Sequence, residues 1–537
     1  MSPAQLGWNA TSKTGAVAGG GADAVAAGAA ILAQGGNAAD AAAATILALN
    51  VTDHGDCSIG GEVPLLIYDA KKNEVKALSG QGRAPLSPAA IAWYMEHGIP
   101  AGDIKMAPVP SVVDLCITVL IRYGTKTFAQ IVAPTLALLD VGAVEWHPRL
   151  AVTLRRLVEE EGLTSGSREE KLQAACDRFY GRHPLRNDIA EDLEAFYIER
   201  GGFLRRADLA AHRTTIEDPV RADYRGHTVY KCGPWTQGPY LCQALRLLEG
   251  FDLKAMGQNS ADYVHVLTEA IKLAMADRDE YYGDPAFVDV PMEALLSEAY
   301  NQLRRPLIDL KKASLEARPG DPRQPKALKG PGVFRQGPGG TTTCVIADRW
   351  GNVVAATPSA NVHHENPAGG RAGVTFGNRL RSLNTTPGHP NCIAPSKRPR
   401  ITLTPTVVLK GGKPVLAISV AGGDLQDQAT LTLLLNHIEF GQLPEQAVRT
   451  PRFATAHHQD SFDPNPKREQ TFIKAGALTI NDRIPLPVRE ELARRGHQVE
   501  AKAAHIATPV MLYIDPAGVF HAAGDPEAGR HAAGLEG

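Results

Sequence analysis

Apolar residues follow the period of helices in some stretches of the chain and the period of strands in others, and the two kinds alternate. Two alanine-rich helical stretches, 22–34 and 38–50, are separated by Gly35-Gly36-Asn37, which is typical of a helix end. Further helices are predicted over 127–141, 150–161, 189–200, 240–249, 261–281 and 426–437. Strands rich in β-branched residues are predicted over 63–70, 74–78, 341–346, 353–357, 404–409 and 415–421. The pattern predicts a protein that mixes helices and strands throughout.

One stretch places flexible glycines directly before a strand. Gly337-Pro338-Gly339-Gly340 precedes Thr341, and the β-branched run that follows meets a turn at Gly351 and then a second strand. A hairpin whose first strand happens to begin with threonines explains this pattern. A cleavage site explains it as well, because hydrolysis before Thr341 would leave an α-amine and a hydroxyl on one residue. Such a residue is a nucleophile with its own base.

The segment before this junction, residues 304–340, is charged, rich in Pro and Gly, and without a hydrophobic period. It is predicted to be an exposed linker. Cleavage at its end would divide the chain into a large part, residues 1–340, and a small part, residues 341–537.

Composition narrows the function classes. The 537 residues can bury a large core, and 56 basic against 58 acidic residues give no excess that would favour nucleic acid or an anionic membrane as a partner. Seven scattered cysteines without a C-x-x-C pair disfavour a disulfide framework and a zinc site. No apolar run reaches the ~18 residues of a membrane span. The first fifteen residues lack the pattern of a signal peptide, so a cytoplasmic location is expected unless a leader was removed.

Three other candidate sites are weaker. Gly19-Gly20-Gly21 and Asp40 have the spacing of a dinucleotide fingerprint, but Asp40 falls within a helical run and not at the end of a strand. The histidine pairs at 363–364 and 457–458 lack a carboxylate at ligand spacing and are predicted to be exposed or hydrogen-bonded loop residues. Cys344 has no histidine nearby in the sequence and is predicted to lie in the core. We therefore expect neither a metal nor a cofactor.

A series of short motifs gives the junction its context. In chain order they are Gly35-Gly36-Asn37-Ala38-Ala39-Asp40-Ala41, Ser58-Ile59-Gly60-Gly61, Arg83-Ala84-Pro85, Tyr224-Arg225-Gly226, Gly283-Asp284-Pro285, Thr341-Thr342, Lys397-Arg398-Pro399, Thr404-Pro405-Thr406 and Gly422-Gly423. In this order they resemble the γ-glutamyltranspeptidase family, a branch of the N-terminal-nucleophile hydrolases, over nearly the whole chain. The resemblance implies an α/β fold, a four-layer αββα sandwich formed jointly by two chains after self-cleavage.

The resemblance also implies roles for individual residues. Thr341 would be the processing point and the nucleophile. Ser359 stands where the family has a second hydroxyl, normally threonine, and Asn361 matches a polar residue of the family site. Gly422 and Gly423 match the backbone N–H pair that binds the oxyanion. Arg83 matches the residue that binds the α-carboxylate of the substrate, although without the family context a surface ion pair would be the better explanation of this arginine.

Some positions depart from the transpeptidase pattern. Ser382, with Arg379 and Arg381 close by, stands where those enzymes have an acidic residue for the substrate ammonium group. Ile401-Thr402 replaces a pair of serines, and the short segment from Ser382 to Lys397 implies that the usual lid is absent. Arginines in place of an acid disfavour a cationic amine. We expect Arg83, Arg379, Ser382 and Thr402 to contact the substrate.

The resemblance thus predicts a self-processing amidohydrolase that cleaves γ-glutamyl or related carboxylate-bearing amides through an ester on Thr341, mainly with water as acceptor. Hydrolytic relatives such as oxamate amidohydrolases are the more similar branch, and cephalosporin acylase activity is a further option. Its partners would be a small amide substrate and its own two cleaved chains as a heterodimer, or a dimer of such heterodimers. The alternative is an unprocessed scaffold or binding protein that has kept the fold without the chemistry.

Overall fold

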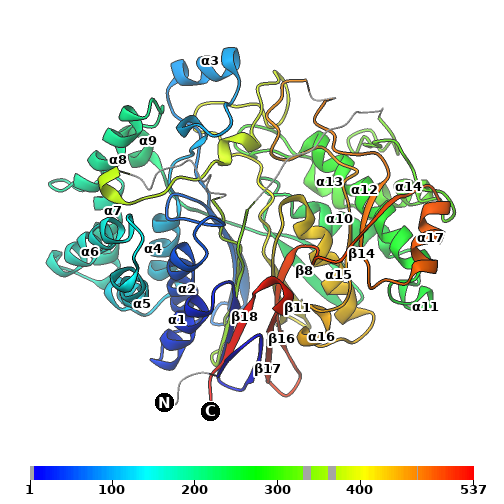
Figure 1. Cartoon of the computed structure of the whole chain (residues 1–537), viewed down its shortest axis with the longest axis horizontal. Helices are drawn as coiled ribbons and strands as arrows, with labels where there is room; N and C mark the ends of the chain where they lie inside the picture. The colour runs from blue at the N-terminus through cyan, green and yellow to red at the C-terminus, as the bar shows by residue number, and fades with distance from the viewer. Residues whose placement is uncertain (1–4, 330–339, 361–369, 468–469, 537) are drawn as a thin grey trace.

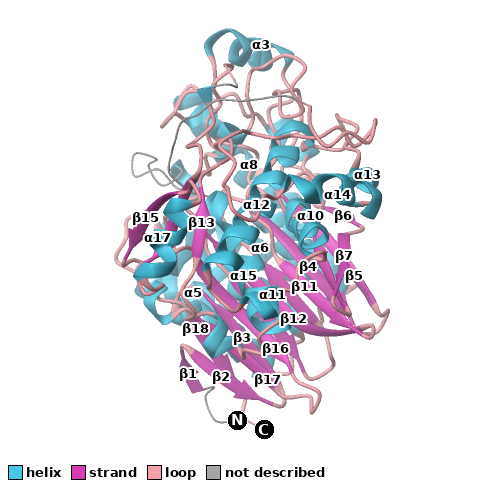
Figure 2. Cartoon of the chain, turned by 90° about the vertical axis from the view of Figure 1, so that its right-hand side faces the viewer, coloured by secondary structure: helices cyan, strands magenta, loops and turns pink. Residues whose placement is uncertain are grey.

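The computed structural model describes residues 5–329, 340–360, 370–467 and 470–536. Its described strands form two large antiparallel sheets and one small sheet (Figures 1 and 2). The first large sheet has the order β1 (Gln5–Gly7), β18 (His531–Gly534), β3 (Gly15–Gly19), β9 (Cys344–Asp348), β10 (Val353–Ala356), β4 (Val63–Asp69), β5 (Glu74–Gly80) and β6 (Thr215–Glu217). The second has the order β2 (Asn9–Ser12), β17 (Phe520–Gly524), β16 (Thr508–Ile514), β12 (Lys413–Ala421), β11 (Thr406–Lys410), β8 (His227–Lys231) and β7 (Val220–Tyr224). The small sheet consists of β13 (Phe453–Thr455), β14 (Ala477–Asn481) and β15 (Gln498–Lys502).

Helices cover the outer face of each large sheet (Figure 1). The layer against the first sheet contains α1 (Ala22–Ala33), α2 (Ala38–Thr52), α4 (Val112–Tyr123), α5 (Phe128–Val141), α6 (His147–Leu163), α7 (Arg168–Phe179) and α8 (Asp188–Glu199). The layer against the second sheet contains α10 (Pro239–Leu248), α12 (Ala261–Tyr281), α14 (Glu298–Arg304), α15 (Gln426–Ile438) and α17 (Leu486–Arg494). The other described α-helices are α3 (Pro88–His97), α9 (Arg206–Ala211), α11 (Leu253–Met256), α13 (Met292–Leu296) and α16 (Pro444–Ala447).

Three apolar clusters account for the layers. One lies between the two sheets and takes side chains such as Ala16 and Val345 from the first sheet and Val407 and Leu512 from the second. The other two lie between each sheet and its helices. Burying both faces of both sheets in this way gives four layers, and the predicted αββα sandwich is confirmed.

The predicted helices and most strands are present, with small shifts at their ends. The strand after the glycines differs more, because it begins at Cys344 and not at Thr341. Pairing with β3 stops at Gly19, opposite Cys344, since the chain turns into α1 after Gly20. The three threonines therefore lie outside the sheet and are held by contacts of other kinds.

The prediction of an exposed linker over residues 304–340 holds only in part for residues 304–329, where exposed residues alternate with buried ones that anchor the segment. Arg304 is fully buried and donates to the carbonyl oxygen of Leu273 on α12. Arg318 pairs with Glu269 at 2.7 Å, and the N–H of Gly320 donates to Asp277 at 2.8 Å. A segment without hydrophobic period can still pack when its arginines meet buried carboxylates. Residues 330–339 lie outside the described residues.

A buried ion pair ties the second sheet to α15. Lys231 on β8 lies 2.7 Å from the carboxylate of Asp427, and both side chains are fully buried. The Lys231 ammonium also donates to the carbonyl oxygen of Thr404 and to the hydroxyl of Thr406. Burial raises the pKa of Asp427 to about 6, and the lysine opposes that rise. The helix that follows the two glycines, Gly422 and Gly423, is therefore held by a charged contact.

Replacing Lys231 by Met is expected to lower the free energy of unfolding by ~3–5 kcal/mol, because it leaves an unpaired buried carboxylate. The double variant Lys231→Met with Asp427→Leu should recover most of the loss. Lys76→Met, which breaks the solvent-exposed pair with Asp218, is the control and should change stability by less than ~1 kcal/mol. Denaturant unfolding measures all three, and equal losses for the two lysine variants would contradict this account.

Candidate active site

The predicted site residues lie along one edge of the sandwich. Cys344 at the start of β9 pairs with Ala356 at the end of β10. Ser419, near the end of β12 in the other sheet, donates to the carbonyl oxygen of Ala356 at 2.8 Å. The starts of β9 and β4 and the ends of β10, β5 and β12 therefore meet at the same edge. The residues just beyond these strand ends are Thr341, Glu62, Ser359, Arg83 and Gly422.

At this edge the hydroxyl of Ser359 contacts both sides of the Gly340–Thr341 bond. It donates to the carbonyl oxygen of Gly340 at 2.8 Å and lies 3.2 Å from the hydroxyl of Thr341. Arg379 Nη2 donates to the same Ser359 oxygen at 2.8 Å. A hydroxyl has one proton and two lone pairs. Because the Ser359 proton goes to Gly340, the Thr341 hydroxyl must donate its own proton to Ser359.

Arg379 carries a buried positive charge into this group. Its Nε donates to Glu62 Oε1 at 2.6 Å, and both side chains are almost completely buried. Burial raises the pKa of Glu62 above its usual range, and Arg379 opposes that rise. The backbones of Glu62 and Ser359 exchange two hydrogen bonds, at 2.8 and 2.9 Å. The ion pair is thereby fixed directly beside the Gly340–Thr341 bond.

The two glycines after β12 adopt backbone conformations that side chains rarely allow, with φ of 146° at Gly422 and 60° at Gly423. Phe462 connects the two glycines to the residues around the Ser359 hydroxyl. It lies against Gly423, and Arg379 stacks over its ring at 5.4 Å. In the amide orientation that satisfies its neighbours, Gln426 accepts from the Gly423 N–H at 3.2 Å. That N–H must leave Gln426, or be shared with it, to bind an oxyanion.

Arg83 lies beside a second buried ion pair. Its Nη1 donates to the carbonyl oxygen of Ser396 at 3.2 Å and lies 3.9 Å from Asp284. Asp284 is also bound by Arg398, at 2.8 Å. Desolvation and the neighbouring Arg398 lower the pKa of Arg83. The structure thus places Arg83 at the same edge as the other predicted site residues but turned toward a protein carboxylate.

Several polar atoms at this edge are buried without a hydrogen-bond partner among the described residues. They belong to three predicted substrate contacts and two neighbours: Arg379 Nη1, Ser382 Oγ, Thr402 Oγ1, Asn378 Nδ2 and Glu62 Oε2. Buried polar groups are normally satisfied, so such a group of unsatisfied atoms needs an explanation.

Sequence reasoning missed several of these residues. Glu62 follows the motif that ends at Gly61, but nothing in its spacing signals an arginine partner more than 300 residues later. Likewise, no motif or spacing in the sequence marks Phe462 or Asn378 as part of the site. Asn361, which the sequence does predict, lies outside the described residues.

The histidine pair at 457–458 is buried, so the exposed alternative is wrong for it, and the hydrogen-bonded one is confirmed. His457 bonds to the carbonyl oxygen of Glu316 at 3.0 Å, and His458 to that of Gln459 at 2.8 Å. The pair at 363–364 lies outside the described residues. Cys344 is fully buried in the layer between the first sheet and its helices, as predicted.

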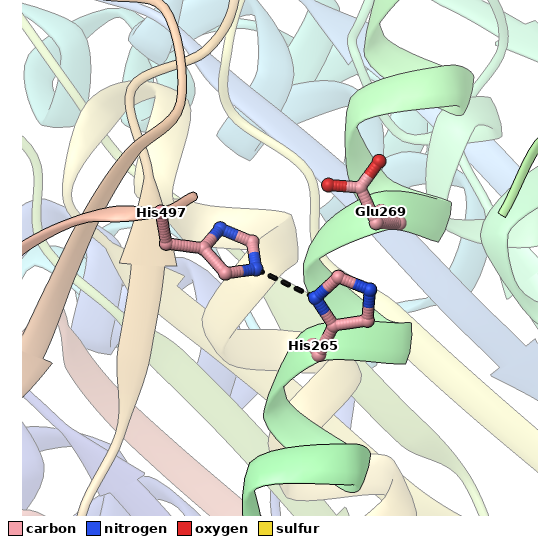
Figure 3. A group of neighbouring side chains, drawn as sticks. All are labelled: His265, Glu269 and His497. Carbon is pink, nitrogen blue, oxygen red and sulfur yellow. Dashed lines mark hydrogen bonds between the residues drawn. The ribbon is translucent and has the colours of Figure 1, made fainter. Parts of the chain in front are cut away.

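Another group, His265, Glu269 and His497, has the residue types of a metal site (Figure 3). The ring nitrogens of the two histidines hydrogen bond at 2.8 Å, and His265 Nε2 donates to the carbonyl oxygen of Asp309. Glu269, however, pairs with Lys272 and Arg318. Two buried cations on the only carboxylate of the group oppose a further cation. Its chemistry fits a neutral histidine pair better than a metal.

The comparisons with known proteins agree with the fold. The gamma-glutamyltranspeptidase family model matches residues 24–147 and 138–535. The glutathione hydrolase proenzyme of Escherichia coli K12 is 30% identical, over 93% of this chain and 88% of the relative. The solved structure of LmbA2991HD is 32% identical with a TM-score of 0.87, covering 98% of this chain and 99% of that chain. Cephalosporin acylase from Bacillus halodurans is 25% identical with a TM-score of 0.80, covering 98% and 97%.

The four layers and the edge at which the site residues meet define an N-terminal-nucleophile hydrolase fold. With the family match over almost the whole chain, the protein belongs to the γ-glutamyltranspeptidase family of hydrolases and acyl transferases. Among the described residues, no helix is both long and apolar enough to span a membrane.

The neutral histidine pair predicts a loss of stability in acid. Burial and the nearby Lys272 lower the pKa of His497 to about 3, below the ordinary value of 6.5. Between these two pKa values His497 is protonated in the unfolded chain but not in the folded chain. The free energy of unfolding therefore falls as the pH drops from about 6.5 toward 3. Thermal unfolding at pH 7 and pH 4 measures this effect.

The drop in Tm between these two pH values should be smaller in His497→Gln than in the unmodified chain. His505→Gln, which changes an exposed histidine, is the control and should show the full drop. An equal drop in all three proteins would refute the assignment to His497.

Proposed function

We propose that the chain cuts itself between Gly340 and Thr341, and that the freed Thr341 then hydrolyses amides of small, carboxylate-bearing acyl groups. The observation that carries this proposal is the Ser359 hydroxyl, which contacts the Gly340 carbonyl oxygen and the Thr341 hydroxyl at once. A carbonyl held by a donor and an attacking hydroxyl one residue away are the two parts that self-cleavage needs.

The proton positions support a specific first step. As the Thr341 oxygen bonds to the Gly340 carbonyl carbon, its proton passes to Ser359, and the proton of Ser359 passes to the Gly340 oxygen. The tetrahedral intermediate formed in this way is neutral, so no unpaired charge appears in a buried site. As the C–N bond breaks, the proton on the former carbonyl oxygen passes to the nitrogen, which gives an ester and the free α-amine of Thr341. Water then hydrolyses the ester and releases the carboxylate of Gly340.

After self-cleavage, Thr341 and the residues around it act on an external amide in place of the chain's own peptide bond. The α-amine of Thr341, whose ordinary pKa is ~7.7–8.0, accepts the proton of its own hydroxyl near neutral pH. The hydroxyl attacks the substrate amide, the amine leaves, and water hydrolyses the acyl ester. Gly422 and Gly423 are proposed to hold the oxyanion, for which Gly423 must give up its contact with Gln426. The two chains, 1–340 and 341–537, remain associated as a heterodimer.

The charges at the site favour an acyl group without an ammonium. Arg379 and Arg381 both flank Phe462, with their guanidinium groups 5.4 and 5.1 Å from the centre of its ring. Arg379 also faces the buried carboxylate of Glu62. The unsatisfied Arg379 Nη1, Ser382 Oγ and Thr402 Oγ1 are suited to the oxygens of an acyl chain. This supports glutaryl-like or oxamate-like acyl groups over γ-glutamyl, and hydrolysis over transfer to an amine.

The test of the proposal is a denaturing gel of the purified protein. The 57.3 kDa chain should give way to two bands, and the smaller should begin at Thr341. Thr341→Ala should stay intact and lack amidase activity. A wild-type chain that stays whole during incubation would favour an unprocessed binding protein of the same fold. A Thr341→Ala variant as active as wild type would refute Thr341 as the nucleophile.

Ser359→Ala is expected to slow self-cleavage by ~10²–10³-fold, because it removes the hydroxyl that takes the proton of Thr341 and passes its own proton to the Gly340 carbonyl oxygen. Ser359→Thr keeps a hydroxyl and should retain most of the rate. The cleaved fraction is followed on gels over time. Cleavage of Ser359→Ala at the wild-type rate would mean that the contact plays no part in the reaction.

Substrate charge gives an independent prediction. Glutaryl anilide should have a kcat/KM at least ~10-fold higher than γ-glutamyl anilide, since the arginines repel the ammonium group of the latter. Release of aniline measures both reactions, and release of ammonia tests oxamate. Faster turnover of the γ-glutamyl compound would contradict the proposed acyl preference while leaving Thr341 as nucleophile.

A further inference from the structure

The residue after the nucleophile is held by a carboxylate from another part of the chain. The hydroxyl of Thr342 donates to Asp53 Oδ2 at 2.5 Å, and its backbone N–H donates to the carbonyl oxygen of Pro358 at 2.9 Å. Thr342 is fully buried. With its backbone and its side chain both fixed, Thr342 has no freedom to turn, and the adjacent Thr341 inherits that constraint.

Asp53 is itself held by several donors. It follows the last residue of α2, and its Oδ1 accepts from the Gly21 N–H and the Thr52 hydroxyl, both at 2.8 Å. Its Oδ2 accepts from Arg530 at 3.2 Å in addition to Thr342. A carboxylate with this many donors is fixed in position.

The glycines before α1 make room for this contact. A Cβ on Gly20 would overlap both Asp53 Oδ2 and Thr342 Oγ1, and one on Gly21 would lie 2.7 Å from Asp53 Oδ1. The Gly20 N–H also donates to the carbonyl oxygen of Thr343 at 3.2 Å. The Gly19-Gly20-Gly21 motif, which has the spacing of a dinucleotide fingerprint, thus serves the close approach of Asp53 to the threonine run.

We propose that Asp53 is a positioning residue for Thr341 that acts through the hydroxyl of Thr342. The inference rests on the proposed function, because it assigns Thr341 as the nucleophile. After cleavage Asp53 and Gly20 belong to the large chain, while Thr342 and Arg530 belong to the small chain. The contact replaces part of the restraint that the Gly340–Thr341 bond provided, and it holds the new N-terminus against the large chain.

The neighbouring threonine provides a matched control. Thr343 is also fully buried, but its hydroxyl has no hydrogen-bond partner among the described residues. Thr342→Val and Thr343→Val make the same chemical change one residue apart. Only the first removes a contact to Asp53.

Thr342→Val should lower kcat, counted per cleaved molecule, by ~10–100-fold with KM changed less than about twofold, because a small misplacement of a nucleophile costs rate and not binding. Thr342→Ser should restore kcat, and Thr343→Val should stay close to wild type. Asp53→Asn should also lower kcat, and thermal unfolding will establish that each variant is folded.

A kcat of Thr342→Val within about twofold of that of Thr343→Val would overturn the proposal. So would a failure of Thr342→Ser to restore the rate. Neither result would affect the assignment of Thr341, which depends on whether Thr341→Ala stays intact and inactive. A wild-type chain that is never cut would instead overturn the proposed function itself.

Discussion

The site depends on one hydroxyl that has a single proton to give. Ser359 donates to the carbonyl oxygen of Gly340, so every other group around it must donate to Ser359, and this fixes the direction of the Thr341 and Arg379 hydrogen bonds. A buried arginine beside a hydroxyl would be costly alone, and Glu62 offsets its charge. The order of strands serves the same end, because it brings the starts of β9 and β4 and the end of β10 to one edge.

The helices and strands were predicted well because both periods are strong, whereas the four layers were predicted from the resemblance to a known family. Helices such as α12 and strands such as β12 are long enough for their patterns to stand out. The start of β9 was predicted three residues too early, because β-branched threonines favour a strand wherever they occur. In the structure β9 begins where its pairing with β3 begins, at Cys344 opposite Gly19. Residues 304–329 were predicted to be exposed because packing by buried ion pairs leaves no hydrophobic period.

Site residues were predictable from the sequence only where they lie near the proposed cleavage site, Gly340–Thr341, or belong to a family motif. Thr341 and Ser359 are close in sequence and contact each other. Glu62, Asp53 and Phe462 take part through partners far away in the chain, and no spacing rule connects them. Arg83 and Gly423 reach the expected edge, but each already has a protein partner there, Asp284 and Gln426. Those two contacts have to change, or be shared, when a substrate binds.

The most direct measurement is the mass of the acylated enzyme. The cut protein is mixed briefly with glutaryl anilide, quenched in acid and digested, and the peptides are analysed by mass spectrometry. The account predicts one added glutaryl group, on the peptide that begins with Thr341. An acyl group on another residue, or on a chain still joined at Gly340–Thr341, would contradict it.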